Sequence, residues 1–556
     1  MRKQLFILAS ILSCLFSFAQ IVNIPDANFK AYLVGNPAIN TNGDNEIQVS
    51  EASAFTGEIN VSNKGISLLW GIEYFTEITG LNCSLNSIQQ LDLSNNKKLI
   101  TLNCSGITLD QYGNNEYPNG QIETLNLTQN TNLKTLICSG NRLTSLDISK
   151  NTELEYLNCR YNRSQYIYEN NEWVETFMTG LDTSKNTKLK HLDIGINRIT
   201  EVDVLNNTEL EFLSCEFNRI SVLDVSNNIN LITLNCGWNN ISYLDISKNI
   251  NLEKLVCANN NLTTIDINLN YDPKPKLKYL DCSYNKLSSI YLDDINSELE
   301  YLNCTSNVIT SININYRRVS NLQTLFCSDN KLTDLNTMNA VVLKKLNCSF
   351  NQLESLIIHW NNIEWVYCND NQLEWFIDRY NNYPTLTRFV GHNNKFKSLD
   401  FSYSPNVSLI NVENNQLTSL NVKNGNNINF LGDGYAPLDT RNNPNLKCVN
   451  VDDANYSNTN WIWKDSQTIY STDCSSTLAT NQTQKSQTKI FPNPVKNILN
   501  IQTEAKLQKV EIYSSNGQLI KTSFLKQINV STLPKGNYIV KITTDKGVQT
   551  EKFIKE

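Results

Sequence analysis

Residues 231–249 read LITLNCGWNNISYLDISKN, and this stretch decides the fold. Its skeleton is L-x-x-L-x-C-x-x-N-x-[LI]-x-x-L-D-[VI]-S-x-N, and most of the 556-residue chain consists of copies of it. The leading residues Leu189, Leu210, Leu231 and Leu252 follow one another in steps of 21. A fixed period of this length indicates a solenoid, in which each coil contacts only its neighbours, so the chain can exceed the size of a single globule.

The copies fill residues 78–450, which we predict to be the solenoid. Alternate side chains of a strand point to opposite faces, so we expect Leu234 and Cys236 of each such coil to lie in the core. Two steps between coils are longer than the others. We expect their extra residues, 110–121 and about 165–180, to form loops that leave the coil without interrupting the pattern.

An asparagine stands three residues after the inward cysteine position of nearly every coil. Its side chain can donate to and accept from backbone groups that the turn after the strand leaves without partners in one coil. We therefore expect a buried asparagine ladder formed by Asn86, Asn141, Asn162, Asn197, Asn218, Asn239, Asn260, Asn285, Asn307, Asn330, Asn351, Asn371, Asn394 and Asn415.

Twelve of the 15 cysteines, from Cys83 to Cys368, occupy the inward strand position of successive coils. Their Cβ vectors would run side by side, whereas a disulfide needs Cβ atoms that face each other at about 3.8 Å. We expect buried thiols that pack as small apolar side chains. Ile194, Gly391 and Val412 fill the same position, which favours packing over redox chemistry.

The segment L-x-x-L-x-[LC]-x-x-N-x-L resembles the leucine-rich repeat family. The second half of the coil, L-x-x-L-D-[VI]-S-x-N, departs from common members because it repeats the same motif. We infer a leucine-rich repeat solenoid that is mostly β, with short parallel strands on one or two flanks and little helix. The resemblance implies a binding face formed by the first strand, and it implies no particular ligand.

Aromatic side chains recur at outward positions beside the first strand. They are the candidate ligand-binding face: Tyr156, Tyr161, Phe212, Phe217, Trp238, Tyr279, Tyr284, Tyr301, Phe326, Trp365 and Tyr367. Exposed aromatic rings favour recognition, because they supply large contact area at little entropic cost. They could also pack laterally and stabilise a parallel sheet. We predict protein binding or adhesion at the cell surface; the alternative is a glycan-binding module that helps to capture polysaccharide.

Other function classes find little support. The net charge is -7 without a basic run, so we expect no nucleic-acid partner. The three histidines, His191, His359 and His392, stand far apart in the repeats. We find no nucleophile motif and no phosphate-binding glycine loop, so we expect a protein that is not an enzyme.

The first residues indicate export. Met1-Arg-Lys is a positive segment, an apolar run follows from Leu5 to Phe18, and Ser17-Phe18-Ala19 is a small-x-small cleavage site before Gln20. Residues 1–19 therefore read as a signal peptide, too short to be a membrane span. No later run approaches 18 apolar residues, so we expect no transmembrane segment.

Residues 20–77 form the expected N-terminal cap, in which Asp26 can start a short helix. Residues 40–51, NTNGDNEIQVSE, resemble the calcium loop of an EF-hand. Calcium is the only cofactor that the sequence suggests, and the resemblance places its ligands at Asn40, Asn42, Asp44, Glu46 and Glu51. Position 1 is Asn instead of Asp and position 6 is Asn instead of Gly, so an Asn-rich capping turn is the other interpretation.

The repeat ends before a C-terminal cap at residues 451–474. Cys448 and Cys474 lie outside the cysteine ladder, and an oxidising destination favours a disulfide between them. Residues 475–489, SSTLATNQTQKSQTK, are small and polar, so we expect a flexible linker.

Residues 490–556 are expected to form a small antiparallel β-sandwich of about seven strands. They resemble the C-terminal sorting domain of the type IX (Por) secretion system, through Pro492-Asn-Pro494, the Asn516-Gly517 turn, Gly536-Asn-Tyr538 and the closing Lys552-Phe-Ile-Lys555. The resemblance implies passage through the periplasm, binding to the type IX secretion machinery, and a final place in the medium or on the outer cell surface.

Overall fold

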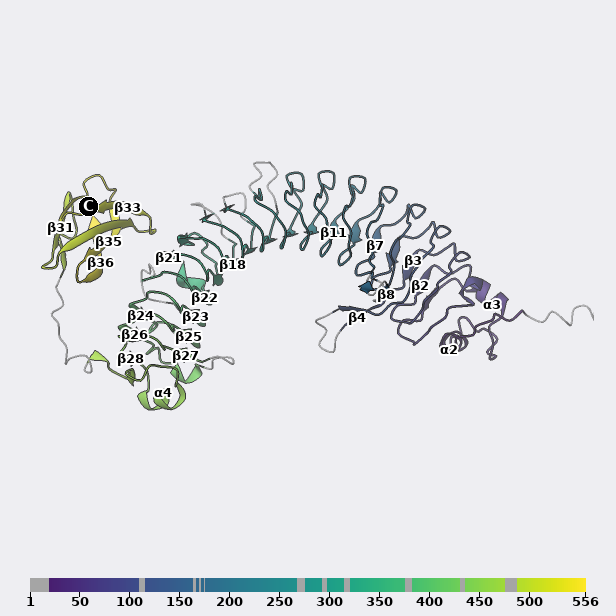
Figure 1. Ribbon diagram of the computed structural model, residues 1–556, viewed down its shortest axis with the longest axis horizontal. Helices are drawn as coiled ribbons and strands as arrows, with labels where there is room; N and C mark the ends of the chain where they lie inside the picture. The colour runs from purple at the N-terminus through teal and green to yellow at the C-terminus, as the bar shows by residue number, and fades with distance from the viewer. Residues whose placement is uncertain are drawn as a thin grey trace, which may run out of the picture. The chain divides into compact units, whose positions relative to one another are not determined.

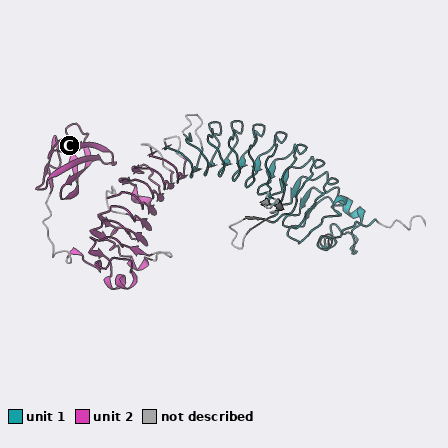
Figure 2. Cartoon of the chain, in the orientation of Figure 1, with its two compact units in different colours: residues 1–288 teal, residues 289–556 magenta. Residues whose placement is uncertain are grey.

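The computed structural model describes residues 20–109, 116–163, 167–169, 172–174, 176–267, 276–292, 298–314, 321–375, 383–430, 436–475 and 488–556. The predicted signal peptide lies outside the described residues. The chain divides into two compact units, residues 1–288 and residues 289–556 (Figure 2). Each unit contains a β-solenoid of parallel strands with little helix (Figure 1). The domain boundaries given above remain predictions.

The first strands of successive coils in unit 1 form one parallel ladder, joined at the same register from coil to coil. Leu213, Leu234 and Leu255 are paired across three neighbouring strands and all three are buried. The strands are β1 (Glu58–Asn60), β2 (Gly80–Asn82), β3 (Thr101–Asn103), β6 (Thr135–Ile137), β7 (Tyr156–Asn158), β10 (His191–Asp193), β11 (Phe212–Ser214), β12 (Thr233–Asn235), β13 (Lys254–Val256) and β14 (Tyr279–Asp281).

Unit 2 continues the same pattern in its own first strands. They are β16 (Tyr301–Asn303), β18 (Thr324–Phe326), β20 (Lys345–Asn347), β22 (Trp365–Tyr367), β23 (Arg388–Val390), β25 (Leu409–Asn411) and β27 (Leu438–Asp439). Its second flank carries the parallel strands that the nested motif predicts. They are β15 (Ser289–Leu292), β17 (Ser311–Ile314), β19 (Asp334–Asn336), β21 (Ser355–Ile357), β24 (Ser398–Asp400), β26 (Ser419–Asn421), β28 (Cys448–Asn450) and β29 (Ile469–Ser471).

The second half of the coil differs between the units. In unit 1, residues 241–249 form no regular strand, and a second buried asparagine joins the coils there instead. Asn249 donates from Nδ2 to the carbonyl oxygens of Val225 at 3.0 Å and Asn228 at 2.8 Å, both in the preceding coil. In this half of the coil, the side-chain hydrogen bonds of the second asparagine therefore link neighbouring coils in place of the backbone hydrogen bonds of a parallel strand pair.

The first asparagine ladder has the expected role, and it links neighbouring coils as well as closing its own turn. Asn239 Nδ2 donates to the Cys236 carbonyl oxygen at 3.2 Å and to that of Cys215, one coil earlier, at 2.9 Å. Its Oδ1 accepts from the Ile220 backbone N–H at 2.9 Å. The same triple set recurs at Asn218 and Asn260.

The cysteine ladder consists of buried free thiols at all twelve positions. Burial raises the pKa of Cys104, Cys236 and Cys348 to about 12, so these thiols stay protonated and unreactive in the folded protein. At Gly391 the missing side chain is replaced by the ring of Phe389, since a Cβ there would lie 2.7 Å from that ring. The ladder is therefore a packing feature.

The two predicted loops are antiparallel hairpins in their described parts. Strands β4 (Ile107–Leu109) and β5 (Glu116–Pro118) pair in the first, and β8 (Ile167–Glu169) and β9 (Glu172–Val174) pair in the second. Both leave the coil without changing the register of the strands on either side.

Short helices close the ends of the repeat array. At the start, α2 (Ala27–Val34) is N-capped by Asp26, as predicted, and buries Phe29 and Leu33; α3 (Val49–Ala54) follows. At the other end, α4 (Ala454–Asn460) leads into the buried Trp461. Within the described ranges, 3-10 turns also occur at Ile72–Tyr74, Trp360–Asn362 and Asn427–Asn429.

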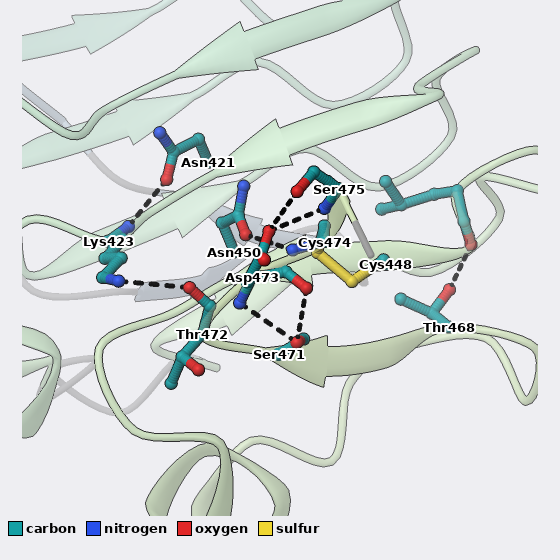
Figure 3. The surroundings of a disulfide bond; sticks show 11 residues. Asn421, Lys423, Cys448, Asn450, Thr468, Ser471, Thr472, Asp473, Cys474 and Ser475 are labelled. Carbon is teal, nitrogen blue, oxygen red and sulfur yellow. Dashed lines mark hydrogen bonds between the residues drawn. A yellow bond between two sulfur atoms is a disulfide. The ribbon is translucent and has the colours of Figure 1, made fainter. Parts of the chain in front are cut away.

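A disulfide joins Cys448 of β28 to Cys474, which follows the neighbouring strand β29 (Figure 3). The two Cα atoms are 5.7 Å apart, within the normal range for a disulfide. The backbone N–H of Cys474 also donates to Asn450 Oδ1 at 2.9 Å. The segment after the last coil is thus held to the sheet by a covalent bond and a hydrogen bond.

Residues 489–555 contain the seven strands of the predicted sandwich, in two antiparallel sheets. One sheet has the order β30 (Lys489–Phe491), β31 (Ile498–Gln502), β34 (Gln527–Asn529). The other has the order β33 (Leu519–Ser523), β32 (Leu507–Ser514), β35 (Gly536–Thr544), β36 (Gly547–Lys555).

Replacing Asn239 by Ala should lower the free energy of unfolding by about 1–3 kcal/mol, because the buried Ile220 N–H loses its acceptor and the Cys215 and Cys236 carbonyls each lose one of two asparagine donors. Urea unfolding followed by circular dichroism measures this. The control is Asn240→Ala at the exposed neighbour, which should change the free energy by less than about 0.5 kcal/mol. Equal losses in the two variants would contradict the ladder's role.

Thiol titration without reductant tests the cysteine assignment. The folded protein, with its signal peptide removed, should react at none of the twelve ladder cysteines, and the chain unfolded in denaturant should react at all twelve. Cys448 and Cys474 should react only after reduction. Fewer than twelve thiols in the unfolded chain would indicate ladder disulfides and would refute the packing interpretation.

Candidate functional site: the first-strand face

Each coil presents three outward positions beside the first strand, and all eleven predicted aromatic residues occupy one of them. In unit 1 the first strand position holds Tyr156, Phe212 and Tyr279, and the turn position before the ladder asparagine holds Tyr161, Phe217, Trp238 and Tyr284. In unit 2 the first strand position holds Tyr301 and Trp365, and the third holds Phe326 and Tyr367.

The turn position has a left-handed backbone. Phe217 has a φ of 51° and Trp238 a φ of 56°, and equivalent turns from Leu85 to Asn442 repeat this conformation. Left-handed backbone costs roughly 1–2 kcal/mol for a residue with a bulky side chain, whereas Gly and Asn adopt it readily. The chain uses Gly140 and Asn259 in the same turn, so aromatic residues there are not required by the fold.

Two ring stacks form on unit 1. His191 lies between Tyr156 at 4.0 Å and Phe212 at 4.1 Å, and its ring plane is within 7° of parallel to each of theirs. Their strands β7, β10 and β11 are neighbours, and the three residues are paired in register. In the turn row, Phe217 and Trp238 stack at 4.7 Å, with 43% and 50% of their surfaces exposed.

A charged network lies between the two stacks. Arg160 binds Glu216 at 3.1 Å, and its Nε is 3.8 Å from Asp193 Oδ2. Asn235 Nδ2 donates to Glu216 Oε2 at 2.7 Å. These groups are mostly buried by their neighbours, which strengthens their attraction and fixes their positions. We call the two stacks and this network the unit 1 patch: Tyr156, His191, Phe212, Phe217, Trp238, Arg160, Asp193, Glu216 and Asn235.

The first-strand face of unit 2 carries a different arrangement. Lys345, Trp365 and Arg388 are paired in register on three neighbouring strands. The Lys345 ammonium lies 4.3 Å from the Trp365 ring centre, and the Arg388 guanidinium lies 5.6 Å from it. Cation–π contacts of this kind hold the indole and position two positive charges beside it.

Sequence reasoning missed two features of the unit 1 patch. His191 belongs to the stack although it was treated as an isolated histidine, because a 35-residue step separates it from Tyr156 along the chain. The left-handed turn was also missed. Its signal was present, since Gly and Asn recur directly before the ladder asparagine, as at Gly140, Asn259, Asn393 and Asn414.

The predicted calcium loop is closed by its own hydrogen bonds. Glu51 Oε1 accepts from the backbone N–H groups of Thr41 at 2.8 Å and Asn42 at 3.1 Å. Both Asp44 carboxylate oxygens accept from loop donors, and Glu46 pairs with Lys30 at 2.7 Å. Carboxylate oxygens of Asp44 and Glu51 thus accept N–H donors of the loop, as in a capping turn, and calcium binding through the oxygens of this loop stays a prediction.

Two properties of the described residues bear on other functions. No group of three or more His, Cys, Asp or Glu side chains there is arranged to hold a metal ion. None of the helices in the described ranges combines the length and apolar character that crossing a bilayer requires.

Residues 489–556 match the family model of the secretion system C-terminal sorting domain. This match covers the whole sandwich and agrees with the motifs in the sequence. No curated protein matches the chain by sequence.

The fold of this chain is similar to those of several solved structures. The functional domain of InlJ from Listeria monocytogenes, described as including a cysteine ladder, is 25% identical with a TM-score of 0.51, and 97% of this chain and 98% of that chain are covered. The Arabidopsis receptor kinase HAESA, solved with the peptide hormone IDA and the co-receptor SERK1, is 19% identical with a TM-score of 0.54; 74% of this chain and 70% of that chain are covered. The second likeness concerns the fold alone.

Burial lowers the pKa of His191 from 6.5 to about 4, so the folded protein keeps this ring neutral where the unfolded chain protonates it. Stability should therefore fall as the pH drops from 6.5 towards 4, because the unfolded state binds the extra proton. Chemical unfolding at several pH values should show a smaller loss over this window for His191→Phe, which keeps an aromatic ring. Equal losses in both proteins would contradict the assignment.

The structure and these matches agree on the organisation of the chain. The coils, the asparagine ladder and the strand ladder are those of a leucine-rich repeat solenoid. The sandwich is a sorting domain that directs type IX secretion to the outer cell surface or the exterior. The chain therefore consists of a solenoid similar to those of leucine-rich repeat proteins and a C-terminal sorting domain of the type IX (Por) secretion system, which directs it to the outer cell surface or the exterior.

Proposed function

We propose that the protein is a noncatalytic binding protein that attaches to another protein at the cell surface through the first-strand face of unit 1. The main support for this proposal comes from the two residues of the unit 1 patch that occupy the turn position, Phe217 and Trp238. Phe217 and Trp238 stand exposed on left-handed backbone that Asn or Gly would occupy at lower free energy. Aromatic residues that remain exposed although their backbone conformation is unfavourable are expected to contact a partner.

A protein partner fits the patch better than a glycan. A sugar ring stacks on the face of an aromatic ring, and both faces of His191 are already covered by Tyr156 and Phe212. Phe217 and Trp238 each cover one face of the other. The patch presents ring edges beside the charged network, which suits a protein surface of mixed apolar and charged side chains.

The double variant Phe217→Asn with Trp238→Asn tests this proposal. Both positions keep a residue that adopts left-handed backbone, so relief of roughly 1–2 kcal/mol of strain per residue offsets a lost stacking energy of about 0.5–1.5 kcal/mol. The variant should fold with nearly unchanged stability. The secreted protein, immobilised and exposed to surface proteins of intact cells, should retain its partner at least about tenfold less well.

Val222→Asn with Tyr243→Asn is the matched control, since these side chains belong to the same two coils and are 74% and 68% exposed. They lie in the second halves of the coils, away from the first strand. The control should retain the partner normally. Equal loss in both variants, or glycan-array binding that Trp238→Ala with Tyr284→Ala abolishes, would contradict protein binding through this patch.

A further inference from the structure

Strand β33 of the sorting domain places apolar side chains on the surface. Leu519 and Ile520 in the strand are exposed, and Phe524 and Leu525 at its end are 69% and 68% exposed. We name residues 519–526 the β33 edge. The core of the sandwich is built from residues outside β33: Val495, Leu499, Ile501, Val510, Ile512, Ile528, Val530, Tyr538, Val540, Ile542 and Phe553.

The β33 edge also lies at the open side of its sheet. Within residues 488–556 β33 pairs only with β32, and past the end of the strand the Lys526 carbonyl oxygen accepts from Ile501 N–H of β31 at 2.7 Å. The opposite edge strand, β36, is covered at its C-terminal end, where Val495 N–H donates to the Ile554 carbonyl oxygen at 2.7 Å and Asn493 Oδ1 accepts from Ile554 N–H at 2.8 Å. An apolar open edge on an exported domain would promote aggregation unless a partner covers it.

Charge adds a second, independent feature. Residues 489–556 contain eleven lysines and five Asp or Glu residues, a net charge of +6 in a chain whose total is -7. Lys521 and Lys526 flank the exposed Phe524 and Leu525. Their Nζ atoms donate to the carbonyl oxygens of Asn529 at 2.8 Å and Thr503 at 2.7 Å, and no carboxylate lies within 4.0 Å of either in the described ranges.

We propose that the β33 edge is the surface by which a protein component of the type IX machinery binds this chain. The partner offers an apolar pocket for Phe524 and Leu525, and acidic side chains around it face Lys521 and Lys526. The sorting function requires recognition of this domain, and the apolar open edge and the net charge of +6 define the chemistry of the surface that would be recognised. This proposal is independent of what the solenoid binds.

The test is export of the full chain in a bacterium with a type IX system, measured as the ratio of surface and medium protein to periplasmic protein. Phe524→Ser with Leu525→Ser should lower this ratio at least about tenfold. Ile498→Ser with Val548→Ser is the matched control, because it removes two other exposed apolar side chains of the same domain. The control should be exported normally.

Charge is tested separately with Lys521→Glu and Lys526→Glu together, which should also lower export, and with Lys→Arg at both sites, which should not. Purified full-length variants should show the unfolding transition of the native sorting domain, so that loss of export reflects loss of recognition. Normal export of the Phe524 and Leu525 variant, or equal loss in its control, would overturn the proposed surface. Normal export of the glutamate variant would overturn the acidic partner.

Discussion

The hydrogen bonds of the ladder asparagines hold the coils of the solenoid together. Each amide joins the turn of its own coil to a carbonyl of the preceding coil, as Asn239 does with Cys236 and Cys215. The Cys236 carbonyl also accepts from Asn260 of the next coil, so successive asparagines share these buried carbonyl groups and link the coils into one chain of hydrogen bonds. Leucines and cysteines then fill the space that the bonded turns enclose, and the sheet register follows from them.

The same bond explains where the candidate binding residues stand. To direct the asparagine inward, the residue before it takes a left-handed backbone and points outward. The fold therefore fixes the position of this residue but not its identity, and Gly, Asn or an aromatic ring can occupy it. In unit 1 the positions filled by Phe217 and Trp238 lie beside the His191 stack and the Arg160 network. The buried asparagine hydrogen bonds thus place a row of side chains on the surface whose identity can vary from coil to coil.

Most of the fold follows from the sequence because its period and its residue types are both forced by packing. The cysteine positions, the ladder asparagines, the end-capping Asp26 and the seven-stranded sandwich were all predictable on this basis. The candidate site was only partly predictable. The stack of His191 on Tyr156 depends on register across a long insertion, and the closure of the Asp44–Glu51 loop depends on which donors reach its oxygens; neither is visible in a repeat pattern.

Oxidative footprinting of the secreted protein, free and bound to the surface proteins of intact cells, tests the central claim most directly. Hydroxyl radicals modify exposed aromatic rings, so the measurement reports which face a partner covers. If the partner contacts the unit 1 patch, Phe217 and Trp238 should become protected on binding, while Tyr243 in the second half of the same coil as Trp238 stays reactive. Protection of Tyr243 with full reactivity at Phe217 and Trp238 would contradict it.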